Sequence, residues 1–210
     1  MLPNKTTWGG DIIFRGGKYH LYAAVMSDGC SLQQWTTHSQ IEHAVSDRIT
    51  GPFEFQDVAV PVFAHNPKII ELQDGTLALI HIGKGNGPKA TDGQCTTSSP
   101  MLDYSSPEDS HNIMPVSDVA TADRRLRRTT EASSNELGST IHLADSVDGP
   151  WIPLQNHTLG NCNNPAPFVV FASCEKAHII YIVCSRAGHS ELKRADDIRG
   201  PCETVSAITP

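Results

Sequence analysis

The chain has 210 residues, of which 39% are hydrophobic and 19% are charged, and its formal net charge is -7. This composition excludes a largely disordered chain and predicts a globular protein with a sizeable core. The acidic balance argues against nucleic acid or an anionic membrane as a partner, because both attract a basic surface. No apolar run approaches the roughly 18 residues that a transmembrane helix needs.

Two features bear on the compartment and point in opposite directions. No apolar segment follows the first residues, Met1 to Lys5, so we predict no signal peptide in this chain. The glycosylation sequons Asn4-Lys5-Thr6 and Asn156-His157-Thr158 slightly favour secretion to the extracellular space. The localisation is therefore left unknown, with a weak lean to a secreted protein.

The cysteines argue against two kinds of site. No C-x-x-C pair occurs, and this absence argues against a zinc site or a thioredoxin-type motif. An even number permits disulfides, but the spacing fixes no pairing. We expect Cys184, within an apolar strand, to be a small buried hydrophobic residue. The six cysteines are Cys30, Cys95, Cys162, Cys174, Cys184 and Cys202.

The first predicted unit, residues 8–62, is a hairpin followed by two more strands. Two apolar strands flank Gly16-Gly17, a pair that tolerates the positive φ of a tight turn. A polar loop then leads to a third strand at 40–45, where apolar and polar residues alternate. Gly51-Pro52 cannot continue a β-ladder and predicts a turn before the fourth strand.

The same order of elements recurs in two further units, residues 63–158 and 159–210. Asp74-Gly75 joins the hairpin strands of the second unit, and a Gly-Pro pair again precedes the last strand of each. The second unit also contains the segment 84–139, which is rich in Gly, Ser, Thr, Asp and Pro. We predict a long loop there, with room for one turn of helix.

Four strands in roughly 50 residues, repeated three times, are typical of β-propeller blades. We therefore predict an all-β fold, a β-propeller of four-stranded antiparallel blades, with residues 1–210 forming one partial domain of about three blades. A β-sandwich with three similar hairpins is the alternative. A closed ring usually needs at least four blades, so the chain is part of a propeller or closes by association.

Five motifs follow one another along the chain. They are Trp8-Gly9-Gly10-Asp11, Ser39 to Ser46 with Gly51-Pro52-Phe53, Ala64-His65-Asn66-Pro67, Gly149-Pro150-Trp151 and Asn164-Pro165-Ala166-Pro167. Taken in this order, the set resembles the five-bladed glycosidases of glycoside hydrolase family 43 and its arabinanase, levansucrase and invertase relatives. The resemblance implies inverting hydrolysis of arabinose-, xylose- or galactose-containing plant or algal saccharides, and about two further blades.

The resemblance also implies carboxylates at the inner ends of the first strands of successive blades. Asp11 matches the general base, and an acidic partner is needed about 6.5–9.5 Å away. The matching positions of the next two units are Asn66 and Asn164, which cannot titrate. The acid would then come from missing blades, which we favour because strands position groups well, or from the long loop. The loop candidates are Asp92, Asp103 and Glu131.

The predicted substrate-binding residues are Trp8, His65, Asn66 and Asn164. A carboxamide donates and accepts hydrogen bonds, which suits sugar hydroxyls, and an indole face suits a sugar ring. Each residue has a structural alternative. Asp11 could only cap a turn, the Asn-Pro pairs could only shape the start of a strand, and Trp8 could pack between blades. We expect Trp151 to pack between blades.

The expected partner is a carbohydrate substrate or ligand. We predict no cofactor and no metal site: an axial calcium ion is conceivable, but no residue pattern supports it, and no metal-binding arrangement of the strand histidines is visible. The oligomeric state is not predicted. The alternative function is a non-catalytic or degenerate carbohydrate-binding propeller, motivated by the two asparagines.

Overall fold

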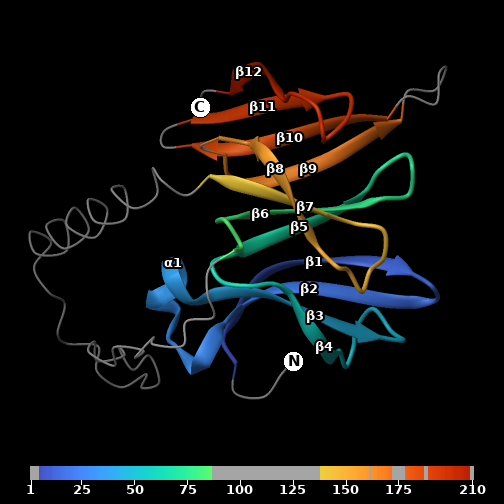
Figure 1. The fold of residues 1–210 in the computed structure, drawn as a ribbon, viewed down its shortest axis with the longest axis vertical. Coiled ribbons are helices and arrows are strands. Elements are labelled where there is room, and N and C mark those ends of the chain that lie inside the picture. Colours follow the sequence, from blue (N-terminus) through green and yellow to red (C-terminus); the bar gives the residue numbers. More distant parts are fainter. Residues whose placement is uncertain (1–4, 87–137, 161, 172–177, 187–188, 209–210) are drawn as a thin grey trace, which may run out of the picture.

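The computed structural model describes residues 5–86, 138–160, 162–171, 178–186 and 189–208, and this part of the chain is all-β (Figure 1). Its strands form three four-stranded antiparallel sheets, each built from four strands that follow one another in the sequence. We term them blades 1, 2 and 3. The predicted loop segment at 84–139 lies almost entirely outside the described residues.

The strands alternate with short turns within each blade. Blade 1 comprises β1 (Thr7–Arg15), β2 (Lys18–Met26), β3 (Ser39–Ser46) and β4 (Glu54–Val60). Blade 2 comprises β5 (His65–Glu71), β6 (Leu77–Ile82), β7 (Ser139–Ala144) and β8 (Ile152–Thr158). Blade 3 comprises β9 (Asn163–Phe171), β10 (His178–Arg186), β11 (His189–Ala195) and β12 (Glu203–Ile208).

The loop predicted between the second and third strands of blade 1 contains short helical turns. They are the 3-10 turns η1 (Ser27–Gly29) and η2 (Leu32–Gln34) and the helix α1 (Trp35–His38). Among the described residues, no helix has the length and apolar composition that a membrane span requires.

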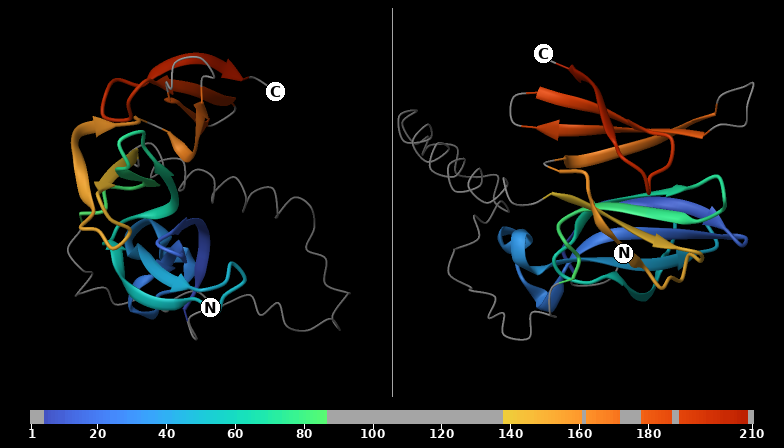
Figure 2. Two further views of the ribbon diagram at one scale, coloured as in Figure 1. Left: turned by 90° about the vertical axis from the view of Figure 1, so that its right-hand side faces the viewer. Right: turned by 45° about the horizontal axis from the view of Figure 1, so that its top comes forward.

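The three blades are stacked face to face, with blade 2 in the middle (Figures 1 and 2). The first strands β1, β5 and β9 are neighbours across the stack. This arrangement of first strands is that of the inner strands of a propeller, and the predicted fold class is confirmed.

The core consists of two apolar layers, one on each side of blade 2. Strand β6 is buried along its whole length, and its side chains alternate between the two layers. Leu77 and Leu79 pack with Tyr22 and Ile41 of blade 1. Ala78, which lies between them in the sequence, packs with Ile180 of blade 3. Ile80 of β6 and Ile182 of β10 belong to the same layer. Blade 2 is therefore held by burial on both faces, as central strands of a layered fold are.

The turn between β7 and β8 locks blade 2 onto blade 1. The Tyr22 hydroxyl donates a 2.6 Å hydrogen bond to the Val147 carbonyl. The Trp151 ring meets the Tyr22 ring edge-on, with centroids 5.4 Å apart. The expectation that Trp151 packs between blades is confirmed. Gly149, two residues before it, has a φ of 78°, which explains why glycine occupies this turn.

The prediction for Cys184 is wrong in one respect. The residue is buried, but it forms a disulfide with Cys162 across 22 residues of sequence. An apolar strand predicts burial, but it does not show which distant thiol lies within bonding distance. Cys202 is a free, partly buried cysteine.

Candidate functional site

Each inner strand begins with one residue in the left-handed region. The φ angles are 55° at Gly9, 51° at Asn66 and 47° at Asn164. All three fall where the register between the first and second strands of a blade shifts. Gly and Asn are the residues that adopt this conformation most readily, so these three positions are structural equivalents.

This equivalence corrects one sequence-based alignment. Asp11 was expected to match Asn66 and Asn164, but the register places Gly9 at that position and Asp11 two residues later. Asp11 follows the bulge and lies opposite Tyr22 in the β1–β2 ladder. The Gly-Gly pair before Asp11 was the available signal, because a bulge of this kind favours glycine.

The three equivalent positions converge. The Asn66 Nδ2 donates a 2.5 Å hydrogen bond to the Asn164 Oδ1, where Asn66 is half-buried and Asn164 is exposed. A Cβ placed on Gly9 would lie 2.7 Å from the Asn66 Oδ1, so only glycine leaves room for this amide. The structure therefore brings together an amide pair from blades 2 and 3 beside the start of blade 1.

The Asp11 carboxylate ties blade 1 to blade 2. Its Oδ1 accepts a 3.0 Å bond from the Ile12 backbone N–H, and its Oδ2 accepts a 3.2 Å bond from the Ile69 N–H of β5. The Lys68 ammonium group adds a 3.3 Å bond to the Gly10 carbonyl. The position of this carboxylate is thus fixed by two backbone donors, one from each blade.

Trp8 lies on an aromatic cluster centred on the buried His65. Its ring centroid is 6.1 Å from that of His65, which is only 4% exposed. The His65 ring also meets Trp35 edge-on at 4.9 Å and Phe63 at 5.3 Å. Burial lowers the pKa of His65 to about 4, so the ring is neutral near neutral pH. His65 therefore contributes to the structure as a neutral ring beside Trp8.

Trp8 and Asp11 share a hollow of about 460 Å³ on blade 1, which Gly9, Leu21 and Ala23 also line. The amide pair of Asn66 and Asn164 is not part of that lining. Four of the five predicted site residues lie at the starts of β1, β5 and β9, and Asp11 lies further along β1, after its bulge. We term these five residues the axial cluster. Its one carboxylate is that of Asp11, and the loop acids Asp92, Asp103 and Glu131 lie outside the described residues.

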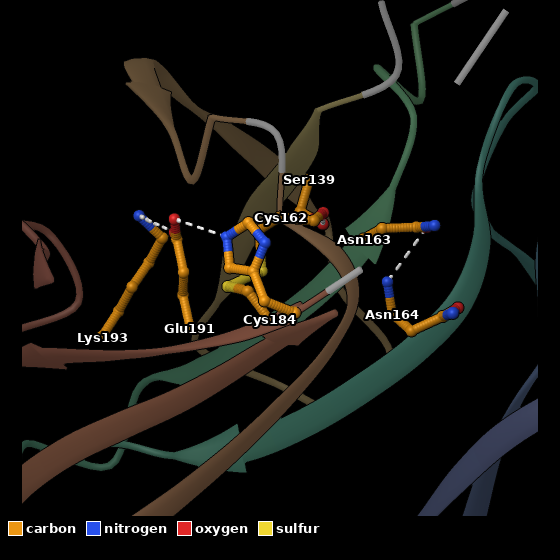
Figure 3. The surroundings of a disulfide bond; sticks show 8 residues. Ser139, Cys162, Asn163, Asn164, Cys184, Glu191 and Lys193 are labelled. Atoms are coloured by element: carbon orange, nitrogen blue, oxygen red, sulfur yellow. Dashed lines mark hydrogen bonds and ion pairs between the residues drawn. A yellow bond between two sulfur atoms is a disulfide. The ribbon is translucent and has the colours of Figure 1, made fainter. Parts of the chain in front are cut away.

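The disulfide holds Asn164 in place (Figure 3). Cys162 precedes β9 directly, and Cys184 lies on β10 where the ladder shifts register. The Ser139 hydroxyl of blade 2 donates a 2.5 Å hydrogen bond to the Cys162 carbonyl. The Asn164 N–H bonds the Asn163 Oδ1 at 3.1 Å. The segment that presents the Asn164 amide is therefore anchored to two blades.

Stacked four-stranded blades with converging first strands define a β-propeller of the kind found in glycoside hydrolase family 43. No protein-family model matches the chain, and no curated protein matches it in sequence. Solved structures do match in fold, and the resemblance stated from the sequence is confirmed at that level.

Three glycoside hydrolase structures illustrate the match. Zg3597, a family 117 enzyme of the marine bacterium Zobellia galactanivorans, is 16% identical with a TM-score of 0.57, and the alignment covers 96% of this chain and 55% of that one. An exo-β-1,3-galactanase of Phanerochaete chrysosporium, bound to galactose, is 10% identical with a TM-score of 0.55, covering 96% and 38%. The GH43_1 enzyme of Xanthomonas citri, bound to xylotriose, is 17% identical with a TM-score of 0.52, covering 96% and 55%. The chain thus spans about half of these proteins or less, and at these identities the likeness is one of fold.

Proposed function

We propose that the protein is glycoside hydrolase-like and that its axial cluster binds a galactose-, xylose- or arabinose-containing saccharide. The observation that supports this most is the solvent-accessible Asn66–Asn164 amide pair, held at the converging starts of the inner strands. Solved structures of this fold include a galactanase bound to galactose and an enzyme bound to xylotriose.

The cluster offers the two kinds of contact that a saccharide needs. After their mutual bond, Asn66 keeps its Oδ1 acceptor and Asn164 keeps its Nδ2 donors, which suit vicinal hydroxyls. Trp8 supplies an apolar face that can cover one side of a sugar ring. Saccharide sites commonly combine an aromatic surface with a few well-placed polar groups.

For hydrolysis, Asp11 would act as the general base. Inversion requires a carboxylate that takes a proton from water and an acid about 6.5–9.5 Å away that protonates the leaving oxygen. The backbone donors of Ile12 and Ile69 would fix the direction from which Asp11 takes the proton. The general acid would come from residues outside the described part of the chain.

Binding without hydrolysis is the second candidate. The two asparagines favour it, because a carboxamide does not provide the proton that an acid would. In this case Asp11 would serve only as the link between blades 1 and 2.

Titration calorimetry with galactotriose and xylotriose tests binding, and release of aryl alcohol from aryl galactosides, xylosides and arabinosides tests turnover. Because glycine suits a positive φ, Asn164→Gly removes the amide while keeping the backbone. We expect this variant to bind at least about tenfold more weakly. The matched control is Gln56→Ala on β4, whose side-chain amide bonds only the Glu54 carbonyl of its own strand among the described residues and lies outside the axial cluster.

The outcomes separate the two candidates. Turnover that Asp11→Asn abolishes, with the fold intact by circular dichroism, supports hydrolysis. Binding that persists in this variant, with no turnover in either protein, supports the second candidate. No saccharide binding at millimolar concentration, or equal losses in Asn164→Gly and Gln56→Ala, would contradict the proposed site.

A further inference from the structure

A second polar cluster lies between blades 1 and 2, away from the axial cluster. His20 lies opposite Ile13, whereas Trp8 pairs with Ala24 near the other end of the β1–β2 ladder. His43 is on β3, and both histidines are buried. The His20 Nδ1 and the His43 Nε2 face each other at 2.9 Å.

The hydrogen bonds of His20 determine which of its nitrogens carries a proton. Its Nε2 lies 3.2 Å from the Arg15 carbonyl oxygen, which can only accept a hydrogen bond. The Nε2 therefore donates, and in the neutral ring the Nδ1 presents a lone pair towards His43. For the 2.9 Å contact to be a hydrogen bond between neutral rings, the His43 Nε2 must donate.

That requirement leaves the other nitrogen of His43 in an unfavourable environment. Its Nδ1 would then carry a lone pair, and this atom is buried without a hydrogen-bond partner. The charged group beside it is the Asp57 carboxylate, 3.7 Å away, which is also an acceptor. A neutral, hydrogen-bonded pair thus turns a buried lone pair towards a carboxylate, which is a costly arrangement.

A second histidine pair shows what a satisfied arrangement looks like. The His81 Nδ1 donates to the Ile82 carbonyl at 3.0 Å, so its Nε2 accepts from the His142 Nδ1 at 2.9 Å. Neither histidine leaves a buried nitrogen without a partner. The two facing nitrogens are 2.9 Å apart in both pairs. The His20–His43 pair therefore differs from the His81–His142 pair in the environment of His43 and not in this distance.

The geometry points to a divalent metal site of the zinc type, with the His20 Nδ1, the His43 Nε2 and the Asp148 carboxylate as ligands. One ligand atom from each of these three residues lies within 4.8 Å of the others. With a metal bound, the His43 Nδ1 carries the proton and directs it at Asp57, while the His20 Nε2 keeps its bond to Arg15. Both ligands then have the carboxylate or carbonyl partner that metal-bound histidines have.

The metal requires only a small movement. Two imidazole nitrogens on a tetrahedral zinc ion lie about 3.3–3.4 Å apart, so the rings must separate by roughly half an ångström. Asp148 is exposed, on the turn between β7 and β8, and can adjust. Because this turn belongs to blade 2, the ion would join two blades.

The fourth coordination position faces solvent. His20 and Asp148 line a polar pocket of about 420 Å³ together with Lys18, Asp47, Arg48 and Glu54. Three protein ligands with one open position leave room for a water molecule or an exogenous anion. Imidazole and carboxylate ligands favour zinc and the neighbouring divalent transition metals over calcium.

Titration of chelator-treated protein with Zn²⁺, and visible absorption after Co²⁺ loading, test the site. A Cys202→Ser background removes the thiol of Cys202, which is free in the described part of the chain. We expect one ion per chain with the intense absorption of four-coordinate cobalt. Asp148→Asn should weaken binding at least about tenfold, and Asp57→Asn about 10- to 100-fold, because Asp57 acts through His43.

The control is His142→Gln, which alters the other histidine pair and should leave both signals unchanged, with folding checked by circular dichroism. The inference is overturned if Zn²⁺ does not bind at about 100 μM. It is also overturned if Asp148→Asn, whose side chain is exposed and whose fold should survive, binds Zn²⁺ as tightly as the unaltered protein does.

Discussion

The backbone conformation of single residues, more than any ionisable group, shapes the axial cluster. Gly9, Asn66 and Asn164 have positive φ, and two of them meet through their side-chain amides. An asparagine at such a position has two roles, because it tolerates the left-handed region and presents an amide. Glycine at the third position leaves the space that the Asn66 amide occupies.

The free-energy cost of the left-handed backbone conformation can be measured at Asn66. Asn66→Ala and Asn66→Gly both lose the bond to Asn164, so the difference between them reports the backbone alone. With φ at 51°, we expect the alanine variant to have a free energy of unfolding about 1–2 kcal/mol lower than the glycine variant. Urea unfolding of both proteins measures this, and equal stabilities would contradict the positive φ.

At the scale of elements, the disulfide lies directly before β9. It closes a loop between Cys162 and Cys184, 22 residues apart, and both side chains are fully buried. It lies beside the bulge that presents Asn164, with the Ser139 hydroxyl bonded to the Cys162 carbonyl (Figure 3). A covalent link at this point joins the stability of blade 3 to the position of a candidate binding residue.

The loss of stability on removing the Cys162–Cys184 disulfide can be predicted. For a loop of this length, the lower entropy of the unfolded chain amounts to about 3 kcal/mol. We expect Cys184→Ser to lower the free energy of unfolding by about that amount in urea titrations. Cys202→Ser, at the free and partly buried cysteine, should cost less than about 1 kcal/mol. Similar losses in both variants would show that the disulfide has no special contribution.

The blades were predictable because their signals are local. Asp74-Gly75 and the Gly-Pro pairs mark turns within a few residues, and alternation along 40–45 marks one strand. The Cys162–Cys184 pairing and the His20–His43–Asp148 cluster were not predictable, since they join elements whose distance the sequence does not state. The offset between Asp11 and Asn66 was missed for a related reason: a bulge shifts the register without changing the apolar pattern.

At the scale of the whole molecule, blade 2 is held between two apolar layers that also bury polar rings. His65, His81 and His142 are buried residues of blade 2, and the rings of His81 and His142 lie 4.9 Å apart. Burial lowers the pKa of His81 to about 3 and those of His65 and His142 to about 4. The stack is therefore built for neutral histidines.

This predicts a loss of stability in acid. In the unfolded chain these histidines titrate near pH 6.5, so below that pH the unfolded state binds protons that the folded state does not. The stabilisation is complete above about pH 6.5 and declines towards about pH 4 for His65 and His142 and about pH 3 for His81, by at most about 1.4 kcal/mol per pH unit for each histidine. Urea unfolding at several pH values measures it, and His142→Gln should reduce the slope. An unfolding free energy that is constant between about pH 7 and about pH 5 would contradict the prediction.

The central claim is that the converging starts of β1, β5 and β9 bind a saccharide. The most direct measurement is a crystal structure of the protein soaked with galactotriose or xylotriose. We predict a sugar within hydrogen-bonding distance of the Asn66 and Asn164 amides, with a ring against Trp8. Density for the sugar at another surface of the blades, or ordered solvent alone at the axial cluster in a fully soaked crystal, would contradict the claim.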